Sequence, residues 1–106
     1  MVKLTGKQKR FLRSQAHNMR PLFQVGKDGL SQAWLDQINE AIEKRELFKI
    51  NLLQNTMVDE DEVIEFIENN SRVTVVQKIG HVLVLYKQAD NKDNRDISWK
   101  VRDLAK

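Results

Sequence analysis

The stretch Phe23-Gln24-Val25-Gly26-Lys27-Asp28-Gly29-Leu30-Ser31 joins a short strand to a helix through a four-residue Gly-x-x-Gly loop. The two glycines allow backbone angles that other residues avoid, and they let a second backbone approach closely. Ser31 is a favourable helix N-cap, because its hydroxyl can accept a hydrogen bond from a free amide of the first turn. Leu30 and Leu35 occupy the two positions of a hydrophobic staple around that cap. The stretch therefore predicts a strand, a tight loop and a helix in direct succession.

The same loop is a candidate phosphate site. Free amides at a helix N-terminus carry a partial positive charge, and Lys27 would add a full charge beside them. The alternative is an ordinary strand-to-helix turn that binds nothing, since Gly-x-x-Gly is a weak pattern by itself. The spacing alone leaves both interpretations open.

Length and composition place the chain among soluble globular domains. With 106 residues, 41% of them hydrophobic and 31% charged, it is long enough for one domain with a real core and too short for two. No apolar run approaches the length of a membrane span, and no signal-peptide hydrophobic region follows Met1. Cysteine is absent, which excludes disulfides and cysteine zinc sites. We therefore expect a cytoplasmic protein with no membrane contact.

Charge is unevenly distributed, although the net charge is only +3. Residues 1–27 contain no Asp or Glu, and residues 59–68 contain no Lys or Arg. A block of one sign creates a local field that the total charge hides, and the positive block includes the Gly-x-x-Gly loop. This distribution favours nucleic acid as the partner. The basic residues of the first block are Lys3, Lys7, Lys9, Arg10, Arg13, Arg20 and Lys27.

Hydrophobic periodicity predicts an α/β (α+β) fold with the element order α-β-α-β-α-β-β. Helices are expected from Thr5 towards Pro21, after Ser31 and from Asp59, and strands at 22–25, 47–53, 73–79 and 82–86. Strands separated by helices should run parallel through right-handed crossovers, and the last pair should form an antiparallel hairpin through Gly80-His81. We predict one domain over residues 1–87, a four-stranded mixed sheet with packed helices. Residues 88–106 are predicted as a charged tail, with a strand or helix docked from it.

Several side chains are assigned to the core rather than to function. Leu12, Gln15 and Met19, flanked by Phe11 and Ala16, are predicted to form the inward stripe of the first helix. Trp34 is taken as a core anchor rather than a base-stacking platform, because it continues the buried stripe of the second helix. His17, at the end of the first helix, could bond carbonyls there or contact RNA directly.

The acidic cluster Asp59, Glu60 and Asp61 admits two interpretations. It could bind a metal, as in a nuclease, but acidic residues in a first helical turn already stabilise the helix dipole. The sequence also contains only two histidines, His17 and His81, which lie far apart in sequence, and it contains no cysteine nucleophile. We expect a protein that is not an enzyme, with no metal, cofactor or small-molecule substrate.

Several blocks of this sequence resemble the YhbY-like proteins, the stand-alone bacterial form of the CRM (chloroplast RNA splicing and ribosome maturation) domain. The resemblance covers roughly residues 4–87. It implies a fold similar to the C-terminal domain of bacterial initiation factor three. It also implies an RNA-binding protein that associates with ribosomal RNA in precursors of the large subunit. We expect the protein to be a monomer. The blocks are Leu4–Leu12, Ala16-His17, Pro21, Val25–Leu30, Glu46–Ile50 and Gly80–Tyr86.

The resemblance also assigns the RNA contact to the Gly-x-x-Gly loop, here Gly26, Lys27, Asp28 and Gly29. Physically, such a loop at a helix N-terminus can clamp a single-stranded backbone while the bases lie on neighbouring surfaces. Basic side chains of the first helix and of the segment after it would add phosphate contacts that tolerate most sequences. These are Lys7, Lys9, Arg10, Arg13 and Arg20, with His17 beside them and with Lys49 and Lys78 as secondary candidates on the polar face of the sheet. A rival hypothesis from another class is a protein-interaction module that docks an acidic partner in translation.

Overall fold

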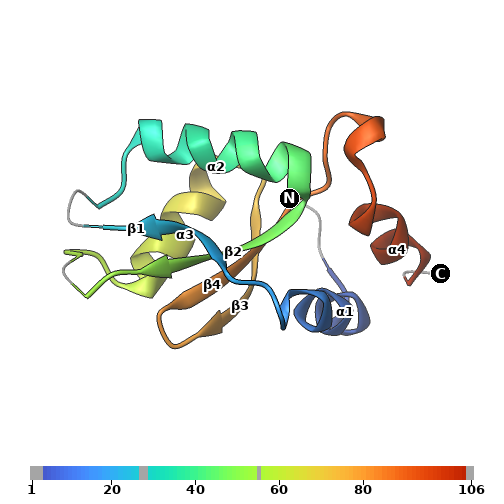
Figure 1. The fold of residues 1–106 in the computed structure, drawn as a ribbon, viewed down its shortest axis with the longest axis horizontal. Helices are drawn as coiled ribbons and strands as arrows, with labels where there is room; N and C mark the ends of the chain where they lie inside the picture. The colour runs from blue at the N-terminus through green and yellow to red at the C-terminus, as the bar shows by residue number, and fades with distance from the viewer. Residues whose placement is uncertain (1–3, 27–28, 55, 105–106) are drawn as a thin grey trace.

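Helices and strands follow one another in the predicted order, and a short 3-10 helix and a further α-helix come after them (Figure 1). The computed structural model describes residues 4–26, 29–54 and 56–104. The elements are α1 (Gly6–Ala16), β1 (Pro21–Val25), α2 (Gln32–Arg45), β2 (Leu47–Leu52), α3 (Glu60–Asn70), β3 (Thr74–Ile79), β4 (Val82–Tyr86), η1 (Lys92–Asn94) and α4 (Ile97–Asp103).

The four strands form one mixed sheet in the order β1-β2-β4-β3. β1 and β2 are parallel, whereas β4 is antiparallel to both of its neighbours, β2 and β3. β4 therefore lies between β2 and β3, the two strands that α3 connects. It forms the predicted hairpin with β3 through Gly80. This confirms the predicted four-stranded mixed sheet with packed helices.

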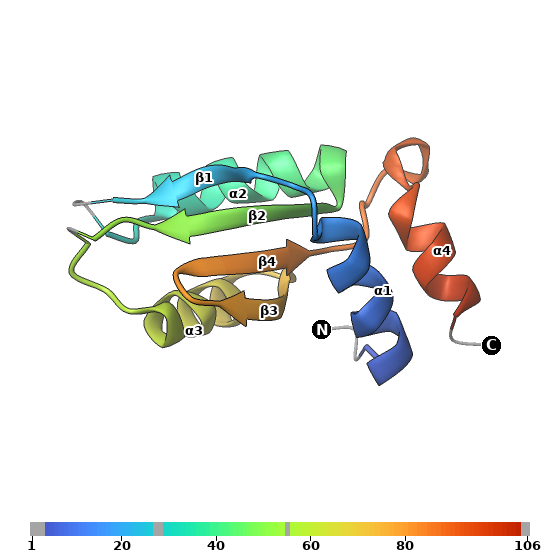
Figure 2. The ribbon, with the colours of Figure 1, turned by 60° about the horizontal axis from the view of Figure 1, so that its bottom comes forward.

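Alternation along the strands gives the sheet two different faces. On one face, Phe48, Ile50 and Leu52 of β2 pack under α2 and α3 in the larger core cluster. On the other face, Leu47 of β2 and Val84 of β4 pack against α1 and α4 in a smaller cluster. Figure 2 shows α2 and α3 together on one side of the sheet, with α1 and α4 at one end of the molecule. α1 and α4 leave part of the second face open.

All three predicted helix starts have the expected caps. Thr5 and Gln8 form a capping box at α1, and Asp59 and Glu62 form another at α3. The Ser31 side chain accepts a hydrogen bond from the backbone N–H of Trp34, at 3.1 Å. Two of the acidic residues at the start of α3, Asp59 and Glu62, thus cap the helix. This agrees with the interpretation that the acidic cluster stabilises the helix.

The predicted inward stripe of α1 is wrong in part. Leu12 is buried as expected, but Gln15 is exposed, and Met19 lies beyond the end of the helix. The buried stripe is instead Gln8, Leu12 and Ala16, which follow one another at intervals of four residues. Gln8 can be buried because its amide is satisfied: it accepts from Thr5 N at 2.8 Å and donates to Val101 O at 2.9 Å.

The assignment of Lys49 and Lys78 to one polar face of the sheet is also wrong. Lys78 pairs with Asp61 of α3 at 3.2 Å, so it lies on the face that α3 covers. Lys49 lies on the opposite face and is almost fully buried, with 9% of its surface exposed. Register explains the difference, because Lys49 is aligned across β4 with Gln77, the neighbour of Lys78.

The C-terminal residues pack against the body of the protein. Glu46 follows α2 in a left-handed backbone conformation, with φ of 63°, and its side chain is buried. Its carboxylate accepts hydrogen bonds from the backbone amides of Ala89 at 2.8 Å, Asp96 at 2.8 Å and Ser98 at 3.3 Å, and from the Ser98 hydroxyl. One acidic side chain at the end of α2 therefore holds the connection that leads into α4.

Candidate nucleic-acid interface

The described ends of the Gly-x-x-Gly loop form a tight turn. The backbone N–H of Gly29 donates to the carbonyl of Gly26 at 3.0 Å, and Gly29 has a φ of 68°. A side chain at Gly29 would be strained by that φ, whereas a Cβ at Gly26 would meet Leu53 Cδ1 at 3.6 Å, an ordinary contact. The turn thus requires a glycine at Gly29 but not at Gly26. Lys27 and Asp28, both predicted to contact RNA, lie outside the described residues.

The helix that follows the loop is anchored to the strand that precedes it. Trp34 Nε1 donates to the carbonyl of Gln24 at 3.1 Å, and the Trp34 ring packs on Phe66 with centroids 6.5 Å apart. Trp34 is thus half-buried and linked to β1, which agrees with its predicted role as an anchor. This bond fixes the N-terminus of α2 relative to the strand that enters the loop.

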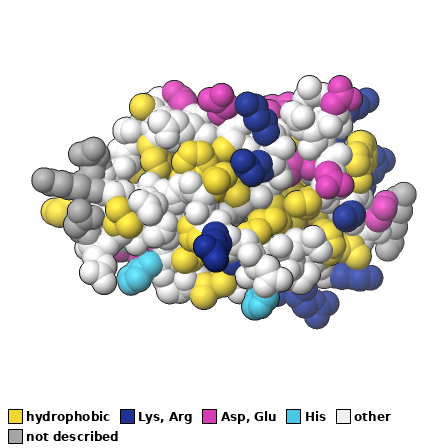
Figure 3. Space-filling view, viewed as in Figure 1, with side chains coloured by type: hydrophobic (Ala, Val, Ile, Leu, Met, Phe, Trp, Pro, Cys, Tyr) yellow, Lys and Arg dark blue, Asp and Glu magenta, His cyan; other side chains and the backbone are white. Residues whose placement is uncertain are grey.

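The exposed surface of α1 is basic. Its charged side chains are exposed, and within the described ranges no carboxylate pairs with them. The His17 side chain forms no hydrogen bond with any described residue, so the expected bond to a helix carbonyl is not seen. Figure 3 shows Lys and Arg side chains over the centre of this view and towards its α1–α4 end. The exposed side chains are Lys7, Lys9, Arg10, Arg13 and His17, with Arg20 just before β1.

The loop and the basic helix lie at opposite ends of β1, as both ribbon views show (Figures 1 and 2). A strand of the length of β1 spans roughly 17 Å. The two predicted contacts are adjacent in sequence but do not form one continuous patch. Any chain that touches both must therefore cross the surface between them.

A groove of about 440 Å³ lies between α1 and the open part of the sheet. Sequence reasoning named some of its residues, Arg13, His17 and Lys49, but not the others. Ser14 follows Arg13 on the helix, and Gln77 aligns with Lys49 across β4, so only the packing of α1 on the sheet brings the set together. The groove is lined by Arg13, Ser14, His17, Lys49, Gln77 and Ile79.

The acidic start of α3 is occupied by other contacts. Glu60 lies 2.6 Å from His81 Nδ1, and this hydrogen bond is the main reason that the pKa of Glu60 is below its usual value. Asp61 pairs with Lys78. Both contacts are made to the β3–β4 hairpin, whereas the Gly-x-x-Gly loop follows β1 at the other edge of the sheet. Among the described residues, no group of three or more His, Cys, Asp or Glu side chains could hold a metal ion.

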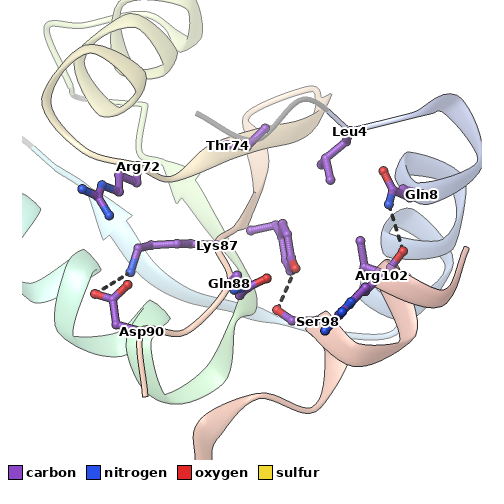
Figure 4. Close-up of a pocket in the computed structure, with 11 residues that line it drawn as sticks. Leu4, Gln8, Arg72, Thr74, Lys87, Gln88, Asp90, Ser98 and Arg102 are labelled. Atoms are coloured by element: carbon purple, nitrogen blue, oxygen red, sulfur yellow. Dashed lines mark hydrogen bonds and ion pairs between the residues drawn. The ribbon is translucent and has the colours of Figure 1, made fainter. Parts of the chain in front are cut away.

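A larger cavity, of about 540 Å³, lies between α1, α4 and the ends of β3 and β4 (Figure 4). Several of its polar groups bond to one another: Tyr86 Oη lies 2.7 Å from Ser98 Oγ, and Lys87 Nζ lies 3.3 Å from Asp90. Burial raises the pKa of the Tyr86 phenol, which favours its neutral form. These contacts attach the C-terminal segment to the sheet. The polar groups of this cavity therefore have a structural role, and no ligand is needed to explain them. Within the described ranges, no helix is long and apolar enough to cross a membrane.

Fold and surface together define a class of small α/β domains with a glycine loop after the first strand and a basic first helix. The sequence matches the CRS1 / YhbY (CRM) domain over residues 4–87, and the chain belongs to that family. The resemblance inferred from the motifs is thereby confirmed.

Individual relatives agree with this assignment. The chain is 51% identical over 94 residues to the Bacillus subtilis protein named "Probable RNA-binding protein YqeI", covering 89% of this chain and 96% of that protein. It is 33% identical over 90 residues to a Haemophilus influenzae protein named "RNA-binding protein", covering 85% and 91%. The solution structure of a Staphylococcus aureus protein, 44% identical, matches with a TM-score of 0.68 over 88% of this chain and 98% of that one.

Proposed function

We propose that this protein binds RNA, as a monomer in the cytoplasm, and that its target is ribosomal RNA in precursors of the large ribosomal subunit. The contacts are the Gly-x-x-Gly loop, Gly26 to Gly29, and the basic surface of α1. Family membership and the names of the relatives support RNA as the partner. The choice of ribosomal RNA rests on the family resemblance.

The observation that carries the proposal is the unpaired basic surface of α1. The solvent-exposed surface of a helix usually carries charges of both signs that pair with one another. The cations of α1, in contrast, form no ion pair with any described carboxylate. Such cations bind phosphates by releasing the counterions that surround RNA, which gives affinity that depends on salt and little on sequence.

Gly26 supplies a second argument. The fold tolerates a Cβ there, so the absence of one is not explained by the turn itself. A missing Cβ allows another backbone to come close, which is what clamping a ribose-phosphate chain requires. Lys27 would supply the charge for that chain.

The first prediction concerns Lys27. Lys27→Ala should weaken binding to a transcript of large-subunit ribosomal RNA and reduce the dependence of log K on log salt by ~0.7 to 0.9. Fluorescence anisotropy at several salt concentrations measures both quantities. Thermal stability should stay close to that of the wild type, since we propose that this lysine serves binding and not the fold.

Lys44→Ala is the matched control, because Lys44 is an exposed lysine of α2 without an ion pair among the described residues. It should leave affinity and salt dependence nearly unchanged. Equal affinity of Lys27→Ala and the wild type would contradict the assignment of the loop. Displacement of bound RNA by an acidic protein, with no effect of either lysine, would favour the protein-docking hypothesis instead.

The choice of ribosomal RNA needs a separate test in cells. Crosslinking followed by sequencing of the attached RNA should recover large-subunit ribosomal RNA. Sucrose gradients should place the protein with particles lighter than the mature subunit. Recovery of messenger or transfer RNA alone would reject the ribosomal target while leaving RNA binding intact.

A further inference from the structure

Lys49 is a buried cation without a carboxylate partner. It is 9% exposed, and its ammonium group makes one hydrogen bond, to the carbonyl of His17, with a length of 3.4 Å. None of the ion pairs among the described residues involves it. Burying a charge is costly unless it is paired and well hydrogen-bonded, so this lysine should destabilise the folded protein.

The groove around Lys49 contains donors and no acidic group. Arg13 contributes a guanidinium and Gln77 an amide. Ser14 and His17 lie beside them, and the Ser14 hydroxyl donates to the carbonyl of Phe11 at 3.0 Å. A volume of about 440 Å³ is sufficient for a phosphate group with the sugar attached to it. An anion in the groove would give Lys49 the partner that the protein itself does not supply.

We propose that this groove, between α1 and the sheet, binds a phosphate group of the RNA backbone, with Lys49 and Arg13 as the charged contacts and the Gln77 side-chain amide as a hydrogen-bond donor. This inference rests on the proposed function, because RNA supplies the phosphate. It assigns to recognition two residues of the sheet, Lys49 and Gln77, which belong to neither the loop nor α1.

The position of the groove supports this role. Lys49 lies in β2, aligned with Pro21 at the start of β1, and Arg13 lies in the last turn of α1. The groove therefore lies where the basic helix meets the open face of the sheet, and β1 leads from there towards the Gly-x-x-Gly loop (Figure 1). An RNA chain bound to α1 could place one of its phosphates in the groove without leaving the basic surface.

The test compares Lys49→Met with Lys44→Met. Methionine retains an unbranched apolar side chain and removes the charge. Lys44 is an exposed lysine of α2 with no ion pair among the described residues, so both variants lose one charge. A fluorescent single-stranded uridine oligonucleotide is titrated into each full-length protein, and anisotropy is measured across salt concentrations.

We expect Lys49→Met to weaken oligonucleotide binding about tenfold, with a salt dependence smaller by about 0.7. Lys44→Met should bind as the wild type does. The melting temperature of Lys49→Met should equal or exceed that of the wild type, because the change removes a poorly paired buried charge. A lower melting temperature together with weaker binding would mean that Lys49 supports the fold, and would overturn the proposal.

A second measurement separates this proposal from the proposed function. Inorganic phosphate added to the RNA-free protein should shift the backbone amide resonances of Ser14 and Gln77 in the wild type but not in Lys49→Met. If the wild type bound no RNA and phosphate still shifted them, the groove would be a site for free phosphate and the proposed function would be wrong. If the wild type and Lys49→Met bound RNA equally, the groove would be excluded and RNA binding would stand.

Discussion

Glu46 shows how much a single residue contributes to this fold. It ends α2 in a left-handed conformation that non-glycine residues rarely adopt, and it is 1% exposed. Its carboxylate is satisfied by three backbone amides and one hydroxyl from the C-terminal segment. The strained backbone and the buried charge are both tolerated because these donors converge on one side chain.

Glu46→Gln should lower the free energy of unfolding by about 2 kcal/mol, since a neutral amide accepts more weakly and brings its own donors into a site full of donors. The melting temperature should fall by about 10 °C. Urea denaturation followed by circular dichroism measures the change. Glu40→Gln, at an exposed position of the same helix, is the control, and an equal effect of both variants would disprove the role of Glu46.

Among the elements of the structure, the loop between β1 and α2 contains two glycines with different backbone requirements. Gly29 has the positive φ that the turn requires, whereas Gly26 has room for a Cβ at ordinary contact distance. Both glycines belong to the same motif, but only one of them is explained by folding. Gly29 is therefore required by the turn, and we propose that Gly26 serves RNA binding.

Gly29→Ala should destabilise the protein by about 1 kcal/mol, because alanine is strained at that φ. Gly26→Ala should leave stability close to the wild type but weaken RNA binding, because a methyl group would hold the RNA backbone away. Thermal unfolding and anisotropy on the same samples test both statements. Loss of stability without loss of affinity in Gly26→Ala would show that this glycine serves the fold alone.

On the scale of the whole molecule, the C-terminal segment is held against the body by a second acidic side chain. Glu43 accepts from the backbone N–H of Asn91 at 2.9 Å and pairs with Lys87 at 3.1 Å. The Asn91 amide is the largest reason that the pKa of Glu43 is below its ordinary value, and Lys87 acts in the same direction. This contact joins α2 to residues beyond the family domain.

A lowered pKa makes stability depend on pH in a defined direction. The stabilisation by Glu43 is fully present above its ordinary pKa of 4.5 and is lost as the pH falls through the lowered value. The wild type should therefore be more stable than Glu43→Gln at pH 7, and the difference should shrink as the pH falls below 4.5. Urea unfolding of both proteins at several pH values measures this difference, and a constant difference would contradict it.

Local patterns predicted most of the fold. Capping boxes at Thr5 and Asp59, the Gly80 hairpin and the alternation along β2 depend on neighbours in sequence, and the structure has all of them. The prediction failed for Gln8 and Gln15, because which polar side chain faces inward depends on a partner far away, the carbonyl of Val101. The boundary between a domain at 1–87 and a tail at 88–106 stays a prediction, although the segment packs closely on the body.

The candidate interface, like the fold, could be predicted only in part from the sequence. The sequence alone determined the basic block, the glycine loop and the family, because charge, spacing and motif are properties of consecutive residues. Only the tertiary structure placed the loop and the basic helix at opposite ends of β1, turned Lys49 and Lys78 to opposite faces, and brought Lys49 beside Arg13 and Gln77. The reason is that strand register and helix packing decide which distant side chains share a surface, and neither is contained in a short stretch of sequence.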